Sequence, residues 1–172
     1  MITVALSTTI GASHERVWRA LVDPDERLIW DERVLGRVES PGRSVERTGR
    51  RRGGRDVENA RGLGRPTLSE TRWRFRLGQV PMVMRDAITQ AEATHRLVSH
   101  ITIGSMQFDQ TLTLHSEDDE GGPRTRLGMK LVARNSIAVI GEVVPRLDVQ
   151  KIVIEFVDTT LRQVQKHCEA EA

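Results

Sequence analysis

The stretch that most constrains the fold is an apolar helix predicted near the C-terminus, from roughly Leu147 to Cys168. Apolar residues recur in it at spacings of three and four, which puts them on one side of a helix. They are Val149, Ile152, Val153, Phe156, Val157, Leu161, Val164 and Cys168, while Asp148, Lys151, Glu155, Asp158, Arg162 and Lys166 fall largely on the other side. At ~1.5 Å per residue this helix is about 30 Å long, enough to cross a small domain. The preceding segments therefore need an apolar face that this helix can close.

Before this helix, the start of the chain predicts one strand and two short helices. Residues 2–10 alternate and are rich in β-branched side chains, which favours a strand. Ser13 can cap a first helix, and Asp23 can cap a second helix in which Pro24 takes the first helical position. Glu26 stands three residues after Asp23, which is a capping-box pattern.

The middle of the chain predicts a series of strands with period-two alternation. We expect them over residues 34–39, 72–77, 82–89, 96–103, 106–114 and 127–133. Asp118, Asp119 and Glu120 fall in the predicted turn at 116–123 and lack the ligand spacing of a calcium loop. We expect these acids to form a solvated turn.

Charge and cysteine content exclude several functional classes. The formal net charge is only +2, so no global field draws the chain to nucleic acid or a membrane. The single cysteine, Cys168, excludes an internal disulfide or a CxxC site, and its position in the apolar stripe predicts a packing role. No apolar run approaches the ~20 residues of a membrane span, and the N-terminus lacks a signal-peptide pattern. We expect a single domain over residues 1–172 and a cytoplasmic protein.

Arginine is concentrated in one glycine-rich segment at about 42–66. Of the 26 basic residues 23 are arginine, and eight of those lie between Arg43 and Arg65. The glycine density predicts a loop or a loosely paired hairpin. Arginine clusters bind phosphates, so an anionic ligand or partner is one alternative. No aromatic residue is interleaved to stack on bases, which argues against nucleic acid as the partner and favours a solvated loop.

Four short stretches near the N-terminus carry a family resemblance. They are the run from Ile10 to Ser13, the residues from Val17 to Leu21, the pair Asp23-Pro24 and the downstream Trp30. Together they resemble the opening of the START-like superfamily, also called the SRPBCC or Bet v 1-like group. The resemblance implies an α+β helix-grip fold, in which a curved antiparallel sheet wraps around a long C-terminal α-helix with two short N-terminal helices.

Members of that group include lipid and hormone carriers, polyketide cyclases and aromatases, quinone-binding proteins and chaperone activators. They share no catalytic motif, so the resemblance implies no catalytic residue here. This chain departs from them in having no tyrosine, a common polar lining residue of such pockets, and in its long Arg/Gly segment.

The resemblance makes a cavity between sheet and helix the expected binding site. Methionine and aromatic side chains would give it a soft, polarizable lining for an irregular apolar ligand. We expect the lining residues to be Trp30, Trp73, Phe75, Met82, Met84, His100, Met106, Phe108, Gln110, Met129, Ile152 and Phe156. Ordinary core packing is the alternative for each of them, because periodicity does not distinguish a lined pocket from a filled core.

Asp86 and His100 are the polar candidates for catalysis. Asp86 shares strand parity with Met84, and we expect His100 and Gln110, in neighbouring strands, to point the same way. A carboxylate and an imidazole that face a closed cavity could act as general acid and base for a cyclisation or dehydration. Exposure or local pairing is the alternative. His95 and His100 are five residues apart and face opposite sides of a strand, so we expect no metal site.

The sequence thus predicts binding of a hydrophobic small molecule, lipid- or polyketide-like, between the sheet and the C-terminal helix. Two alternatives stay open. One is a polyketide cyclase or aromatase-type enzyme that uses the same cavity, and the other is a chaperone-activator-like interaction module whose cavity is filled. We expect no cofactor, and neither the identity of the ligand nor the oligomeric state follows from the sequence.

Overall fold

The structure is a computed structural model that describes residues 1–39, 68–134, 137–138 and 147–170. The Arg/Gly segment predicted as a loop at 42–66 lies outside the described residues. In chain order the elements are β1 (Ile2–Ile10), α1 (His14–Val22), α2 (Pro24–Trp30), β2 (Val34–Arg37), β3 (Ser69–Leu77), β4 (Val80–Glu92), β5 (Arg96–Ile103), β6 (Met106–Ser116), β7 (Thr125–Ala133), β8 (Ile137–Ala138), β9 (Leu147–Asp148) and α3 (Val149–Ala170).

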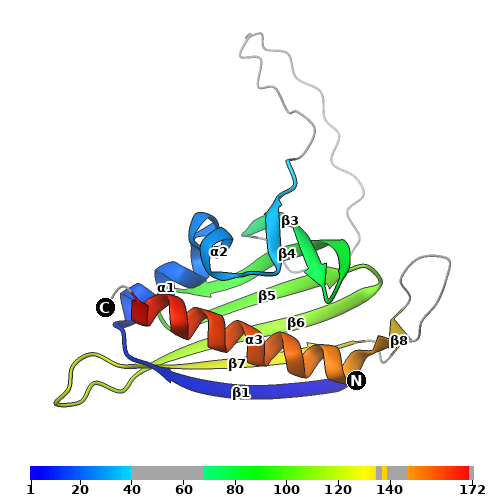
Figure 1. Cartoon of the computed structure of the whole chain (residues 1–172). Helices are drawn as coiled ribbons and strands as arrows, with labels where there is room; N and C mark the ends of the chain where they lie inside the picture. The colour runs from blue at the N-terminus through cyan, green and yellow to red at the C-terminus, as the bar shows by residue number, and fades with distance from the viewer. Residues whose placement is uncertain (40–67, 135–136, 139–146, 171–172) are drawn as a thin grey trace, which may run out of the picture.

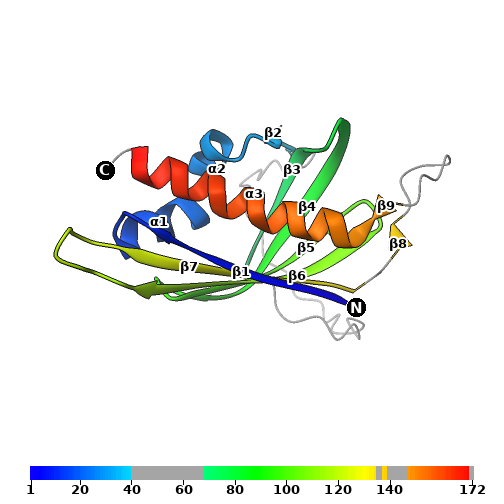
Figure 2. The ribbon, with the colours of Figure 1, turned by 60° about the horizontal axis from the view of Figure 1, so that its bottom comes forward.

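Seven of the strands form one antiparallel sheet in the order β1-β7-β6-β5-β4-β3-β2. The short strands β8 and β9 pair with each other just before α3. Figures 1 and 2 show the sheet curving around α3, with α1 and α2 at the end of the sheet where α3 finishes. This is the α+β helix-grip fold that the resemblance implied.

The core lies between α3 and the inner face of the sheet, which is the face turned toward α3. Burial alternates along the strands, so that every second residue of β5, β6 and β7 is buried. The buried residues of α3 are Val149, Val153, Phe156, Val157, Thr160, Leu161, Val164 and Cys168. This confirms the predicted apolar stripe and the packing role of Cys168, while Ile152 is only partly buried. No helix among the described residues is long and apolar enough to cross a membrane.

The N-terminal helices begin at the predicted caps. The Ser13 hydroxyl accepts a hydrogen bond from the backbone N–H of Arg16 at 3.2 Å, which satisfies one of the donors at the start of α1. The Asp23 carboxylate accepts from the N–H of Asp25 at 2.8 Å, and Pro24 stands at the first position of α2. Both caps were readable from the sequence because they depend on residues within three positions of each other.

Glu26 does not complete the predicted capping box. Its carboxylate accepts hydrogen bonds from Arg16 Nη1 at 2.7 Å and from Arg19 Nε at 2.6 Å, both on α1. The backbone N–H of Asp23, which a capping box would engage, donates instead to the carbonyl of Arg19 at 2.9 Å. That part of the prediction is wrong because α2 follows α1 directly, and the N–H of Asp23 already closes α1.

The turn between β6 and β7 agrees with its prediction. Asp118, Asp119 and Glu120 are all exposed. Their local bonds are those of a turn, since Asp119 Oδ1 accepts from the N–H of Gly121 at 2.8 Å and Asp118 Oδ1 accepts from that of Arg124 at 3.1 Å. The hydrogen bonds to these two aspartates stabilise the chain reversal between β6 and β7.

The packing of the sheet against α3 predicts that two aliphatic residues of that helix contribute unequally to the free energy of unfolding. Leu161 is 5% exposed and Ile154 is 43% exposed. Leu161→Ala should lower the free energy of unfolding by about 2–5 kcal/mol, because it leaves a cavity in the core. Ile154→Ala should change it by about 0.5 kcal/mol or less. Urea unfolding followed by far-UV circular dichroism measures both, and equal losses would contradict the assigned orientation of α3.

Candidate functional site

The predicted lining residues mostly lie in the interior between the sheet and α3. Those that are at most 5% exposed are Trp73, Phe75, Met84, Met106, Phe108, Gln110, Met129 and Phe156. The rings of Phe75 and Phe156 have centroids 6.1 Å apart, and those of Phe108 and Phe156 are 6.5 Å apart with planes within 17°. The apolar side chains of this set belong to one buried cluster, so much of the predicted lining acts as packed core.

A pocket lies at one edge of this interior, between the β3 end of the sheet and α3. Its volume is about 240 Å³. We call it the α3 pocket, and its lining residues are Glu32, Arg33, Phe75, Arg76, Leu77, Gly78, Ile152, Glu155, Phe156, Thr159 and Gln163. Of the residues predicted to line a cavity, the pocket therefore includes Phe75, Ile152 and Phe156.

Arg33 fixes the inner wall of the α3 pocket. Its Nη2 donates to Thr160 Oγ1 at 2.9 Å and its Nη1 to the carbonyl of Phe156 at 3.3 Å, so it ties the segment before β2 to the middle of α3. The guanidinium carbon lies 4.6 Å from the ring centroid of Phe156 and 5.5 Å from that of Phe75. At these distances the cation is attracted by the faces of both rings.

Arg33 is held by a buried carboxylate. Asp31 Oδ1 accepts from Arg33 Nε at 2.8 Å and Asp31 Oδ2 from Arg33 Nη2 at 3.1 Å, and the Asp31 side chain is fully buried. Arg27 Nε lies 3.4 Å from the same carboxylate, and Arg27 Nη1 donates to Asp86 at 2.7 Å. Two guanidinium groups and two carboxylates thus form a neutral, largely buried cluster beneath the α3 pocket.

Two tryptophans enclose the far side of that cluster. The guanidinium carbon of Arg27 lies 5.7 Å from the ring centroid of Trp30 and 5.6 Å from that of Trp73. The indole N–H of Trp30 donates to the carbonyl of Ala20 at 2.8 Å, which holds α2 on α1. Trp30 is therefore a packing residue between the two helices and the sheet.

Asp86 and His100 are not brought together. Asp86 pairs across the sheet with the buried Ile101 on the inner face, whereas His100 lies on the outer face. There His100 Nδ1 is 3.0 Å from Asp109 Oδ1. The expectation that His100 points the same way as Gln110 is wrong, because Gln110 opposes Ser99 across the β5–β6 ladder and donates to its hydroxyl at 3.0 Å.

His100 is removed from the interior lining by its position on the outer face. Met82 is half-buried at the β3–β4 hairpin, and its Cε lies close to Gly104 in the β5–β6 turn. Among the described residues, no three His, Cys, Asp or Glu side chains gather as a metal site.

Sequence reasoning missed Arg33 and Asp31, the charged residues that shape the α3 pocket. They closely follow Trp30, but nothing in their spacing distinguishes them from solvated charges at the end of a helix. The partners of Arg33 on α3, Thr160 and Phe156, are more than a hundred residues away in the chain. Thr160 gives no local signal of Arg33 either, because its hydroxyl donates to the carbonyl of Phe156 within α3 at 2.7 Å.

The burial of Asp31 predicts a specific pH dependence of stability. Burial alone would raise the pKa of Asp31, but the guanidinium groups of Arg33 and Arg27 outweigh it and hold the pKa below 3.8. Since the folded pKa lies below the unfolded value of about 3.9, the contribution of Asp31 is complete above that pH and is lost as the pH falls toward the folded pKa.

Asp31→Asn should therefore lower the free energy of unfolding at pH 7 by roughly 3–5 kcal/mol, because it leaves buried arginine charge without its partner. The difference from the wild type should shrink as the pH is lowered from 5 to 3. Urea titrations of both proteins across this range measure it. A difference that is the same at pH 7 and pH 3 would contradict the assigned ion pair.

No protein-family model matches the sequence, and no curated protein matches it either. Solved structures do match. A START superfamily protein from Mycobacterium smegmatis has a TM-score of 0.66 at 14% identity, with 99% of each chain covered. The Zhui aromatase/cyclase from Streptomyces sp. R1128 has a TM-score of 0.65 at 14% identity, covering 98% of this chain and 93% of that one.

A third match is a protein from Thermus thermophilus, with a TM-score of 0.64 at 19% identity and 99% of each chain covered. The three structures agree in fold over almost the full length of this chain, although little sequence is shared. The chain therefore has the fold of the START superfamily. This is the helix-grip fold that the resemblance of its N-terminal stretches implied.

Proposed function

We propose that this protein binds a hydrophobic small molecule, lipid- or polyketide-like, in the α3 pocket. The observation that carries the proposal is the opening between β3 and α3, where the rings of Phe75 and Phe156 meet the apolar side chains of Leu77 and Ile152. Apolar ligand surface buried there would supply most of the affinity, at roughly 25 cal/mol per Å². The fold supports the proposal as well, because it sets a curved sheet against one long helix and so forms a groove at their edge.

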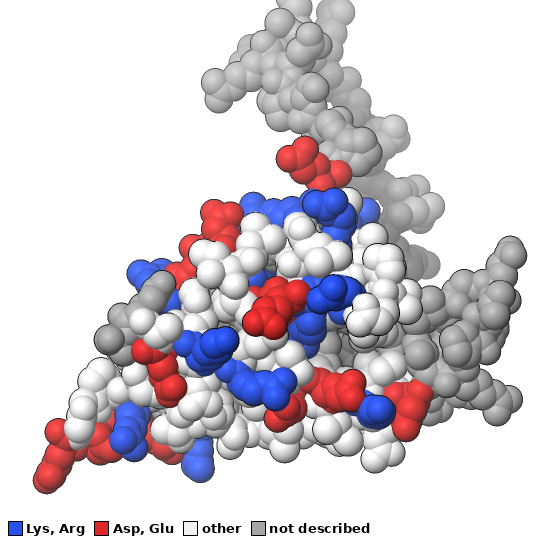
Figure 3. Space-filling view, viewed as in Figure 1, with Lys and Arg blue, Asp and Glu red and all other residues white. Residues whose placement is uncertain are grey.

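The charges around the pocket favour a ligand without net charge. Glu32 and Glu155 carry negative charges at its rim, and Arg33 and Arg76 carry positive charges. Arg33 is paired with Asp31, and Glu155 lies 3.9 Å from Lys151 Nζ, so Glu32 and Arg76 remain and balance each other in charge. Figure 3 shows the same balance over the whole face that carries α3, where acidic and basic side chains are intermixed. Polar groups of a neutral ligand, such as hydroxyls or carbonyls, would find the side chains of Thr159 and Gln163 in the pocket wall.

The volume of the pocket limits the size of the ligand. At about 240 Å³ it is smaller than the ~300–1,000 Å³ of most small-molecule sites. A larger ligand requires the pocket to extend inward, where the ring of Phe156 lies against that of Phe108. A change in the side-chain rotamer of Phe156 would join the pocket to the methionine-rich interior. Methionine side chains adapt readily to a new neighbour, so they suit such an extension.

A cyclase-type reaction has less support. One of the similar structures is an aromatase/cyclase, but the acid and base candidates of this chain, Asp86 and His100, lie on opposite faces of the sheet and cannot act on one bound substrate. Asp86 is moreover engaged by Arg27. The interaction-module alternative depends on residues 43–65, which lie outside the described residues. Binding is therefore the function that we propose.

The proposal predicts that filling the pocket weakens the binding of a neutral apolar probe. Thr159→Trp places an indole in the pocket and should weaken the affinity for N-phenyl-1-naphthylamine at least tenfold, as measured by the rise in probe fluorescence on binding. Asp158→Trp is the matched control, because Asp158 is the preceding residue of α3 and is exposed. It should bind the probe as the wild type does.

Equal affinity of the two variants would place the probe elsewhere and contradict the proposed site. Far-UV circular dichroism confirms that both variants are folded before they are compared. Native mass spectrometry of the freshly purified protein provides an independent measurement. A non-covalent adduct that disappears under denaturing conditions, and is absent from Thr159→Trp, would identify the natural ligand class by its mass.

A further inference from the structure

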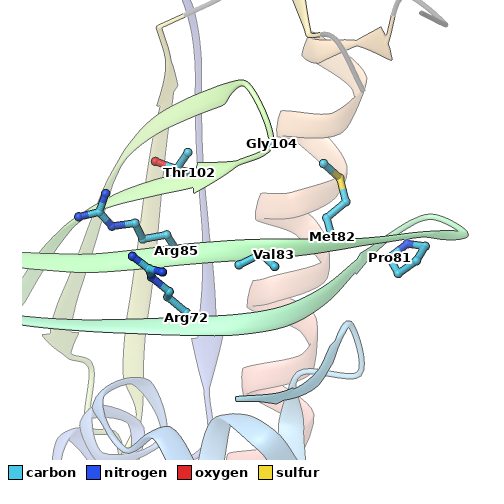
Figure 4. Close-up of a pocket in the computed structure, with 7 residues that line it drawn as sticks. All are labelled: Arg72, Pro81, Met82, Val83, Arg85, Thr102 and Gly104. Carbon is cyan, nitrogen blue, oxygen red and sulfur yellow. The ribbon is translucent and has the colours of Figure 1, made fainter. Parts of the chain in front are cut away.

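A second pocket lies on the opposite side of the sheet from α3. It is formed by β3, β4 and the end of β5, and its volume is about 390 Å³ (Figure 4). Its side chains Arg72, Arg85 and Thr102 alternate along their strands with the buried residues of the inner face. We call it the outer pocket. It shares no lining residue with the α3 pocket.

The outer pocket has an excess of positive charge. Arg85 Nη2 donates to Glu70 Oε2 at 2.6 Å, and Arg72 Nε lies 3.6 Å from the other oxygen of the same carboxylate. Two guanidinium groups therefore share one negative charge, and each is about half exposed to solvent. The hydrogen bond from Arg85 holds the pKa of Glu70 below 4.5, so Glu70 is ionised at neutral pH and still leaves one positive charge uncompensated.

Apolar surface adjoins these arginines. Val83, on β4, is 52% exposed, and Pro81 is exposed two residues before it. Figure 4 shows Val83 between the arginine side chains at one end of the pocket and Pro81 and Met82 at the other. The pocket thus presents cations at one end and a hydrocarbon surface at the other.

The β5–β6 turn forms the apolar end of the pocket. Gly104 adopts a φ of +58° there, and a Cβ at this position would lie only 2.7 Å from Met82 Cε. The glycine serves both the turn and the close approach of the methionine. The end of the Met82 side chain therefore lies close to the turn, and both residues line the pocket.

We propose that the outer pocket binds a small amphipathic carboxylate, an apolar chain that ends in one carboxylate group. The carboxylate lies against Arg85 and Arg72, whose planar guanidinium groups can each donate two parallel hydrogen bonds to it. The chain lies along Val83 and Pro81 and covers their exposed surface. The pocket volume is within the range of small-molecule sites. This inference is independent of the proposed function, because the two pockets open on opposite faces of the sheet.

Glu70 competes with the ligand for the same guanidinium groups. A ligand carboxylate at Arg85 has to share or replace a hydrogen bond that Glu70 now accepts, and the two carboxylates repel each other. Removing the charge of Glu70 should therefore strengthen binding. This gives the proposal a test by gain of affinity, which loss of folding cannot imitate.

The test is isothermal titration calorimetry with decanoate at pH 7.5 and low ionic strength, with 1-decanol as the uncharged comparison. Arg85→Gln should weaken decanoate binding about tenfold, the value of one lost charge-assisted hydrogen bond. Glu70→Gln should strengthen it severalfold. The matched control is Arg126→Gln, since Arg126 is also about half exposed on the outer face and pairs with Glu117 at 3.3 Å. It should bind decanoate as the wild type does.

The site is mapped by the backbone amide shifts of Val83 and Thr102 in ¹H–¹⁵N spectra, which should move with decanoate in the wild type and in Thr159→Trp. Three results would overturn the proposal. The first is an equal effect of Arg85→Gln and Arg126→Gln on decanoate affinity. The second is loss of decanoate binding in Thr159→Trp but not in Arg85→Gln. The third is no gain of decanoate affinity in Glu70→Gln.

Sedimentation with phosphatidylglycerol vesicles distinguishes binding to a lipid surface from binding of a dissolved ligand. Vesicle binding that needs Arg85, without decanoate binding, would replace the proposed ligand by a membrane.

Discussion

The structure depends on the packing of α3 against the inner face of the sheet. The sheet has one face that is apolar along most of its length, and α3 supplies an apolar stripe that matches it. Burial of this shared surface is the main stabilising contribution, because hydrophobic free energy scales with the apolar area removed from water. The α3 pocket lies at the edge of this packed interior, between β3 and the helix. The packing therefore sets where this pocket lies.

The buried ionic cluster determines the shape of the opening. Asp31, Arg33, Arg27 and Asp86 balance one another in charge, and Arg33 reaches the carbonyl of Phe156 and the hydroxyl of Thr160 on α3. A buried ion pair of this kind often adds little net stability compared with apolar packing, because both charges lose their hydration. Here the ionic cluster acts mainly by holding a segment of the chain in position. It fixes the segment between α2 and β2 relative to α3, and the wall of the pocket is defined by that contact.

The two faces of the sheet differ in the ligands they suit. Toward α3 the charges are balanced, which supports the proposal of a neutral apolar ligand for the α3 pocket. On the outer face of β3 and β4, two arginines share one glutamate beside exposed valine and proline, so an amphipathic anion fits there. The difference follows from the alternation of a strand. Arg72 is the neighbour of Trp73, and Arg85 that of Met84, so adjacent residues serve opposite faces.

Much of the fold was determined by local patterns in the sequence. The caps at Ser13 and Asp23, the alternation of the strands and the apolar stripe of α3 each depend on residues within a few positions, and all were predicted.

The arrangement of the candidate site was not predicted from the sequence. Periodicity fixed which residues are buried, but it did not distinguish a filled core at Phe108 from a pocket wall at Phe156. His100 was assigned to the wrong face because its orientation depends on the register between β5 and β6, which the sequence of one strand does not specify. Arg33 and Asp31 were missed for a related reason. Arg33 acts through contacts with α3, more than a hundred residues away, and only the tertiary structure brings those partners together. Asp31 pairs with the nearby Arg33 and Arg27, but only the tertiary structure buries that pair.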